Sequence, residues 1–238
     1  MIRLCSRFVS VSFIIVSLAS PWVSLAAGPA AAAQPEVSGR IRVIDGDTFE
    51  VGDVRVRLFG VDAPEQGQTC GGNGKQVWAC GAWVTTEVRS RYEGRRASCA
   101  RLDTDRYGRA VARCSVDGKD VGRTLVSEGL AFAYRQYSLD YDLDEKRAAV
   151  RGVGVHGAEV QRPAEYRAET RSAANAAALS AAPQGCVIKG NVSSKGARIF
   201  HVPGQQYYAA TRIDESKGER WFCSEAEARK AGWRKARQ

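Results

Sequence analysis

Apolar and polar residues alternate with a period of two through three short runs that begin near residue 40. Successive side chains of a strand point to opposite faces, so this alternation predicts three half-buried antiparallel strands. Only Gly52 and Asp53 separate the second run from the third, which is typical of a compact hairpin. The same alternation places Arg57 on the face opposite the core. The apolar positions are Ile41 and Val43, Phe49 and Val51, and Val54, Val56 and Leu58.

A second hairpin is indicated by residues 96–102 and 109–116, with Cys99 and Cys114 opposite each other. Helical spacing marks three further segments, 75–92, 121–130 and 142–150. Five short strands with about three helices outside them predict an α+β fold that is mainly β: an OB-like five-stranded barrel, plus a small C-terminal domain. The expected division is a signal peptide (1–27), a linker (28–35), the main domain (36–162), a second linker (163–184) that is at most partly helical, and the C-terminal domain (185–238).

The first residues have the order of a secretory signal peptide. Arg3 and Arg7 precede the apolar run 8–19, and small residues suited to cleavage follow it. The run is shorter than the roughly 20 residues that span a membrane, although an uncleaved anchor is the alternative. We therefore expect a periplasmic or secreted monomer with no stable membrane association after cleavage.

Seven cysteines become six if Cys5 leaves with the signal peptide, and cysteines of exported proteins usually pair. Six cysteines permit about fifteen connectivities, so proximity is only a guide. Metal ligation is the alternative, but the chain has no C-x-x-C pair and only two histidines. The pairs that proximity favours are Cys70 with Cys80, Cys99 with Cys114, and Cys186 with Cys223.

Two acidic loops are expected to meet at one end of the sheet. Residues 45–48 (Asp-Gly-Asp-Thr) lie between the first two strands, and residues 62–65 (Asp-Ala-Pro-Glu) follow the third. Each alone is better explained as a simple turn or loop exit, but together they bring up to four carboxylates to one place, which suits a hard divalent cation. Arg57 and Arg109 add two guanidiniums that can hold phosphate oxygens. An acidic metal site beside two arginines indicates phosphoryl chemistry.

A net charge of +9 favours a polyanionic partner, although a merely soluble basic surface explains it as well.

Residues 43–48, 57–65 and 105–109 together resemble the thermonuclease (staphylococcal nuclease-like) family, and the resemblance spans roughly residues 36–162. It implies that Asp47, Asp62 and the carbonyl of Ala63 bind Ca²⁺, with Asp45 supporting the metal site. Glu65 is then the candidate general base or water-orienting group, and Arg57 and Arg109 bind the scissile phosphate. Ala63 replaces the threonine found at this point in the best-studied member, which should alter rate or affinity without abolishing activity. The further candidates for contact with nucleic acid are Arg106, Tyr107, Tyr134 and Tyr137, and for the two later tyrosines simple packing is an equal alternative.

The C-terminal segment looks like a small module appended to exported nucleases. Two functional interpretations compete there, a metal site of Cys186, Cys223 and His201 and a basic aromatic surface that tethers DNA. A disulfide of the two cysteines is favoured over the metal site, and a merely solvated surface is the alternative to DNA binding. In the whole chain no element resembles a base reader, so we expect a Ca²⁺-dependent endonuclease acting on DNA and RNA, single strands favoured, with little sequence preference. The rivals are a catalytically silent nucleic-acid-binding module and an envelope interaction protein on the same fold.

Overall fold

The computed structural model describes residues 36–183 and 185–237. The predicted signal peptide (1–27), its linker (28–35) and Cys5 lie outside this range. Within the described residues, no helix has both the length and the apolar character needed to cross a membrane.

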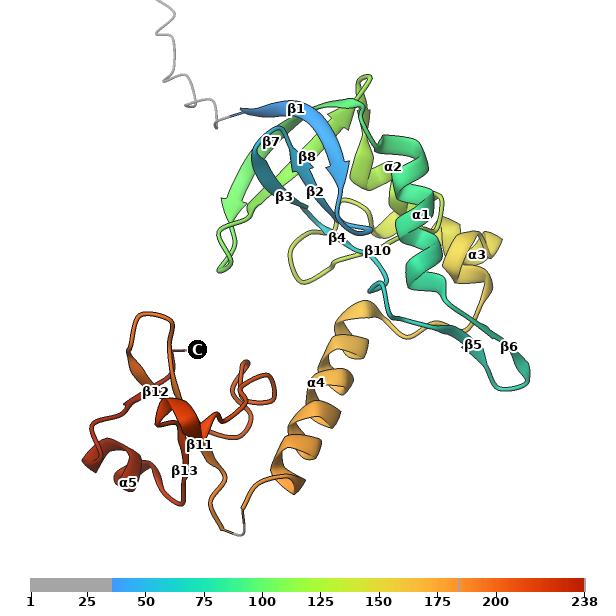
Figure 1. Cartoon of the computed structure of the whole chain (residues 1–238). Coiled ribbons are helices and arrows are strands. Elements are labelled where there is room, and N and C mark those ends of the chain that lie inside the picture. The colour runs from blue at the N-terminus through green and yellow to red at the C-terminus, as the bar shows by residue number, and fades with distance from the viewer. Residues whose placement is uncertain (1–35, 184, 238) are drawn as a thin grey trace, which may run out of the picture. The chain divides into compact units, whose positions relative to one another are not determined.

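A closed barrel of five strands forms the main body of residues 36–162 (Figure 1). The strands are hydrogen-bonded in the order β3-β2-β1-β7-β8, and a parallel pairing of β3 with β8 closes the ring. The α+β, mainly β, OB-like barrel expected from the sequence is therefore confirmed. The barrel strands are β1 (Glu36–Val43), β2 (Thr48–Val51), β3 (Val54–Leu58), β7 (Arg96–Thr104) and β8 (Ala110–Val116).

The strand registers follow the alternation in the sequence. Val51 pairs with Val54 across the expected two-residue turn, where Gly52 has φ +59°, a conformation that glycine adopts at little cost. Cys99 pairs with Cys114 across β7 and β8 and forms a disulfide with it. Val54 was expected on the core face but is 36% exposed, because it lies at the turn where the strand leaves the barrel.

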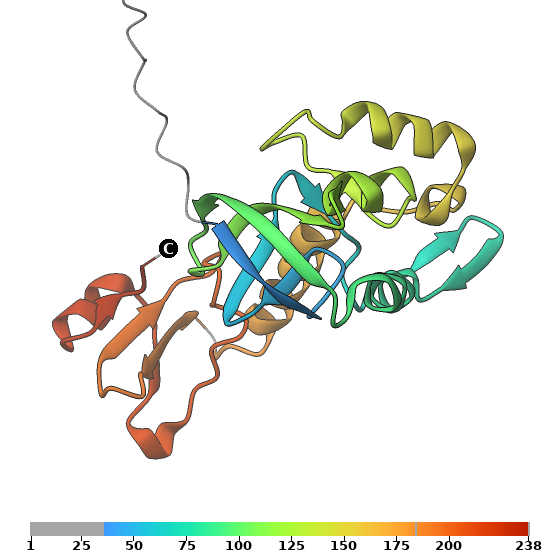
Figure 2. The ribbon, with the colours of Figure 1, turned by 90° about the horizontal axis from the view of Figure 1, so that it is seen from above.

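Three helices pack outside the barrel, α1 (Cys80–Tyr92), α2 (Val121–Ser127) and α3 (Asp142–Arg151), as Figure 2 shows from above. The prediction of a helix from residue 75 was wrong for its first turn. Residues 75–78 form strand β6 (Lys75–Trp78), which pairs with β5 (Cys70–Gly72) around a turn whose glycines have positive φ. The Cys70–Cys80 disulfide closes this hairpin at the start of α1. The remaining short elements of this region are β4 (Val61–Asp62), β9 (Lys119–Asp120), β10 (Phe132–Ala133) and η1 (Gly154–Gly157).

The segment expected as a linker is an 18-residue helix, α4 (Pro163–Ser180). Pro163 occupies the first turn, where its missing N–H costs nothing, and the following residues are rich in alanine, the best helix former. The helix was not predicted in full because most of its residues are exposed, so its sequence lacks the apolar stripe by which a helix is recognised.

The C-terminal module has its own small core, built from Ile188, Phe200, Phe222, Ala228 and Trp233. Cys186 and Cys223 form a disulfide, so the alternative of a cysteine-histidine metal site was wrong. His201 Nε2 instead lies 3.1 Å from Asn191 Oδ1. The elements are β11 (Ile188–Val192), β12 (Arg198–His201), η2 (Glu215–Lys217), β13 (Arg220–Phe222), α5 (Glu225–Lys230) and β14 (Arg234–Lys235).

Candidate active site

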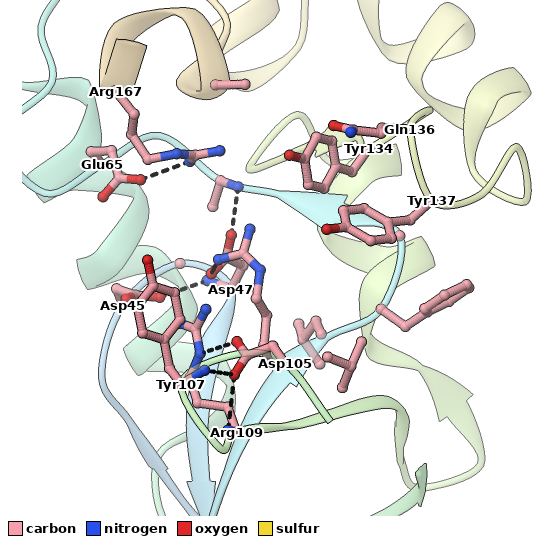
Figure 3. A pocket seen from close by; sticks show the side chains of 18 of the residues that line it. Asp45, Asp47, Glu65, Asp105, Tyr107, Arg109, Tyr134, Gln136, Tyr137 and Arg167 are labelled. Carbon is pink, nitrogen blue, oxygen red and sulfur yellow. Dashed lines mark hydrogen bonds and ion pairs between the residues drawn. The ribbon is translucent and has the colours of Figure 1, made fainter. Parts of the chain in front are cut away.

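A cavity of about 770 Å³ opens where the two acidic loops meet. Its walls come from both loops, from β3, from the 105–109 turn, from residues 134–137 and from one face of α4 (Figure 3). Every residue that the sequence analysis placed in the site lines this cavity except Asp62, whose carboxylate is bonded to two of the lining arginines.

One guanidinium joins the two acidic loops. Arg57 Nη1 lies 3.0 Å from Asp47 Oδ1, and Arg57 Nη2 lies 3.0 Å from Asp62 Oδ1. Both carboxylates are nearly buried, with side chains 6% and 4% exposed. The alternation of β3 produces this geometry: Val56 and Leu58 point into the core, and Arg57 between them points into the site.

Close packing of the loops depends on Gly46. A Cβ atom at this position would lie 2.5 Å from the Cβ of Ala63 and 3.0 Å from Val84 Cγ1. With glycine there, the Ala63 N–H donates to Asp47 Oδ2 over 3.1 Å and ties the second loop to the first. Within the first loop, the Asp47 N–H donates to Asp45 Oδ1 over 3.1 Å, which fixes the turn.

Burial destabilises the negative charge of the acidic loops. Desolvation, together with the neighbouring charge of Asp47, raises the pKa of Asp45 to about 6. Desolvation also raises the pKa of Asp62, despite the opposing effects of Arg167 and Arg57. The loops would therefore gain from an additional cation.

The donors suit a hard cation, although no three Asp, Glu, His or Cys side chains among the described residues lie close enough together to hold a metal as they stand. Arginine groups separate them: Arg57 lies between Asp47 and Asp62, and Arg167 lies between Asp62 and Glu65. Carboxylate oxygens are the donors that Ca²⁺ and Mg²⁺ prefer, and in this site they are already gathered around positively charged groups. The residue set thus fits a divalent ion that would replace some of these arginines as the positive charge between the carboxylates.

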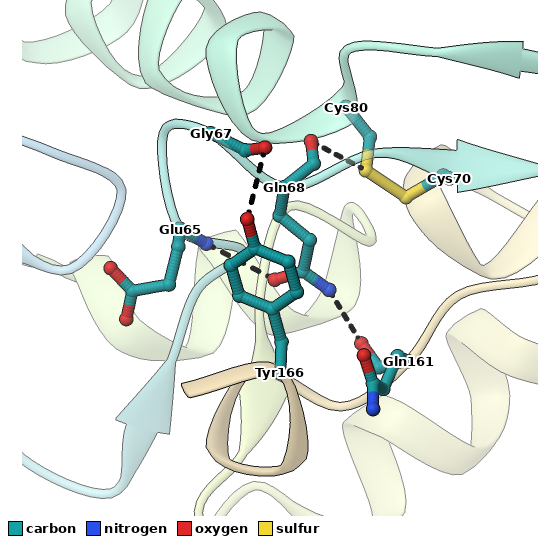
Figure 4. The surroundings of a disulfide bond; sticks show 7 residues. All are labelled: Glu65, Gly67, Gln68, Cys70, Cys80, Gln161 and Tyr166. Atoms are coloured by element: carbon teal, nitrogen blue, oxygen red, sulfur yellow. Dashed lines mark hydrogen bonds between the residues drawn. A yellow bond between two sulfur atoms is a disulfide. The ribbon is translucent and has the colours of Figure 1, made fainter. Parts of the chain in front are cut away.

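Glu65 extends into the cavity from a firmly held backbone (Figure 4). Its N–H donates to Gln68 Oε1 over 3.2 Å, and Gln68 Nε2 donates to the carbonyl of Gln161 over 2.7 Å. Gln68 is fully buried and lies beside the Cys70–Cys80 disulfide. The side chain of Glu65 is 41% exposed, so its carboxylate is accessible while its main chain is fixed.

Arg109 is oriented by a turn that it closes itself. Asp105 Oδ1 accepts the N–H groups of Tyr107 and Arg109, and Asp105 Oδ2 accepts Arg109 Nε over 2.7 Å. Burial alone would raise the pKa of Asp105, but these hydrogen bonds bring it below its usual value. The guanidiniums of Arg106 and Arg109 lie 5.1 and 5.4 Å from the ring centre of Tyr107, which brings all three side chains of the turn together.

Tyr134 and Tyr137 form an aromatic wall of the cavity. Their ring centres are 4.9 Å apart, and Tyr137 is 62% exposed. The structure thus excludes core packing for Tyr137, whose ring packs on Tyr134 at the cavity wall.

Sequence reasoning missed Arg167. This residue of α4 pairs with both oxygens of Asp62 (2.9 and 3.2 Å) and with Glu65 Oε1 (2.8 Å). Burial would lower the pKa of Arg167, but these ion pairs raise it above its usual value. The available signal was the spacing of Arg167 and Arg171, four residues apart on a continuous alanine-rich stretch.

The chain matches known proteins in two parts. Residues 55–152 match the family described as staphylococcal nuclease homologue, and residues 166–235 match the family described as ArfC.

Individual relatives agree with the first match. The chain is 39% identical over 119 residues to the succinoglycan biosynthesis protein ExoI of Rhizobium meliloti (strain 1021), covering 49% of this chain and 58% of the relative. It is 36% identical over 111 residues to an uncharacterized endonuclease of Escherichia coli O157:H7, covering 44% and 66%. It is 30% identical over 153 residues to the micrococcal nuclease of Shigella flexneri, covering 57% and 82%. The chain thus spans about three fifths of the first relative and just under two thirds of the second, but most of the third. On these matches and the barrel that carries them, the chain belongs to the staphylococcal nuclease homologue family.

Proposed function

We propose that this protein is an exported, Ca²⁺-dependent nuclease that hydrolyses phosphodiester bonds of DNA and RNA with low sequence specificity. The observation that carries the proposal is the single guanidinium of Arg57 joining Asp47 and Asp62 at an open cavity that Arg109 also lines. The relatives named as nucleases support the same activity.

In this proposal, Asp47, Asp62 and the carbonyl of Ala63 would hold the ion, with Asp45 in support. When bound, the ion would supply Lewis-acid stabilisation and a template for the in-line attack of water on phosphorus. Glu65 accepts a proton from the attacking water at its exposed carboxylate, or orients that water.

The arginines bind the phosphate. Arg57 and Arg109 donate hydrogen bonds to its oxygens and stabilise the negative charge that grows in the transition state. The short ties of Asp105 to Arg109 keep that guanidinium in place, so little reorganisation is needed.

Substrate contacts outside the scissile phosphate come from the cavity walls. Tyr134 and Tyr137 stack on bases, and Arg106 and Tyr107 contact the strand. Stacking on a ring does not depend on base identity, which agrees with low sequence specificity. Unstacked bases are available in single strands, so we expect these to be preferred.

Three disulfides support export into an oxidising compartment, the periplasm or the extracellular space. We propose a monomer without stable membrane association, in which residues 36–162 form the catalytic domain and residues 185–238 an accessory domain.

Hydrolysis of single-stranded DNA with Ca²⁺ and with a chelator tests the proposal. Glu65→Gln and Arg57→Ala should each reduce kcat by about 10²-fold or more, because they remove proton transfer and charge stabilisation respectively. The matched control is Arg55→Ala, two residues earlier on β3, whose side chain is 54% exposed and pairs with Glu50 instead. Cleavage that persists in the chelator, or binding without any cleavage, would contradict the proposal and favour a binding module.

A further inference from the structure

Helix α4 forms a wall of the cavity although it lies outside the residues matched by the nuclease family, 55–152. Ala164, Arg167, Ala168 and Arg171 line the cavity, a spacing of three and four residues that belongs to one helical face. The two alanines on this face have short side chains, so Arg167 and Arg171 are the long polar side chains that α4 contributes to the lining of the cavity.

The contacts of Arg167 are those that a metal ion would need. A carboxylate offers about four lone-pair positions, and on Asp62 two are taken by Arg167 and one by Arg57. Arg167 also holds Glu65 Oε1. A divalent ion on Asp62 would compete for the same oxygens and repel the guanidinium, since like charges a few ångströms apart are strongly unfavourable in a partly buried site.

The helix itself is anchored independently of these ion pairs. Tyr166 Oη donates to the carbonyl of Gly67 over 3.1 Å, and Gln68 donates to the carbonyl of Gln161 just before the helix (Figure 4). Loss of the contacts of Arg167 with Asp62 therefore frees one side chain and leaves α4 attached beside the cavity.

We propose that Arg167 is a third phosphate-binding arginine, held on Asp62 and Glu65 until a divalent cation displaces it toward a phosphate of the bound nucleic acid strand. This inference rests on the proposed function. The displaced guanidinium stays in a cavity that Arg57 and Arg109 also line, and there it adds a bidentate donor for phosphate oxygens. Arg167 thus competes with the cation before the substrate binds and contributes to substrate binding afterwards.

The test compares the full chain with Arg167→Gln and Arg171→Gln in two measurements. Calorimetric titration with Ca²⁺, without nucleic acid, should show roughly fivefold tighter binding to Arg167→Gln, because a competing positive charge is gone. Arg171→Gln should bind Ca²⁺ as the unchanged protein does, since among the described residues Arg171 has no ion pair with the acidic loops. At saturating Ca²⁺, Arg167→Gln should raise the KM for single-stranded DNA roughly tenfold and change kcat less than twofold.

A variant that keeps the positive charge controls for the possibility that Arg167→Gln perturbs the fold. Arg167→Lys retains the charge and loses the planar fork, so both its Ca²⁺ affinity and its KM should fall between those of the unchanged protein and Arg167→Gln. Equal or weaker Ca²⁺ binding by Arg167→Gln, or an unchanged KM, would overturn the inference while leaving the nuclease proposal intact. Failure of the unchanged protein to bind Ca²⁺ and cleave DNA would instead overturn the nuclease proposal, and this inference with it.

Discussion

Replacement of Gly46 by alanine should separate the two acidic loops. The added methyl group would lie 2.5 Å from the Cβ of Ala63, closer than carbon atoms can approach, and 3.0 Å from Val84 Cγ1, which is already a tight contact. The main chain must therefore move, and overpacking of this kind costs about 1–3 kcal/mol. For a chain of this size that corresponds to a fall of about 2–12 °C in Tm.

Thermal unfolding followed by circular dichroism measures the stability, and Ca²⁺ titration measures the loop geometry. Gly46→Ala should lower both Tm and Ca²⁺ affinity, because the N–H of Ala63 loses its contact with Asp47. Gly67→Ala, two residues after the second loop, is the matched control, since its methyl group would meet only Tyr166 Oη at 3.7 Å. Its Tm should fall much less.

A second substitution distinguishes the clash from a general effect of alanine in the loop. Ala63→Gly removes the opposing methyl group, so the double variant should recover at least about 1 kcal/mol relative to the sum of the single changes. The reasoning is refuted if Gly46→Ala unfolds at the same temperature as the unchanged protein, or if Ala63→Gly recovers nothing.

Three further predictions concern other parts of the chain. Replacing Cys70 and Cys80 by serine opens a loop with a sequence separation of 10 and should lower the free energy of unfolding by about 2–3 kcal/mol. The variant should have a lower Tm, and reductant should lower its Tm less than it lowers that of the unchanged protein. Burial raises the pKa of Asp45 in the folded protein to about 6, above its usual 3.8, so without metal the folded state loses stability as the pH rises from about 4 to 6. Asp45→Asn should therefore raise Tm at pH 7 but not at pH 3.5. An equal gain in Tm at both pH values would contradict this. Lys189→Met leaves the buried carbonyl of Tyr208 and the partly buried carbonyl of Thr211 without their donor and should destabilise the C-terminal module by about 1–3 kcal/mol, with DNA cleavage unchanged; normal stability in a melt of this variant would contradict it.

The sequence was sufficient to predict the barrel because strand alternation and a two-residue turn are local signals. Both hairpins, including the Cys99–Cys114 pair, follow from side chains that must alternate between core and solvent. Elements with weak or mixed patterning were harder. The β5–β6 hairpin contains helix-forming residues near α1, and glycine conformations that the sequence does not reveal decide its turn.

The site was predictable in its acidic loops and in Arg57 and Arg109, whose residue types and spacing were visible. Arg167 was not, because its role depends on where an exposed helix meets the barrel. That meeting is determined by Gln68 and Tyr166, single polar contacts between distant segments that leave no periodic signal in the sequence.

Closure of the barrel brings Arg57 and Arg109 together at the cavity. In the parallel pairing of β3 with β8, Arg57 is the register partner of Val111, two residues beyond Arg109. Arg57 also pairs with Thr48 of β2, and Arg109 Nη1 reaches Thr48 Oγ1 at 3.5 Å. An isolated hairpin of β2 and β3 would hold Asp47 beside Arg57 but would lack Arg109. The phosphate binding proposed for these arginines would therefore require the closed barrel, whereas the acidic first loop needs only its own turn. Variants that weaken closure should lose phosphate binding before they lose that turn.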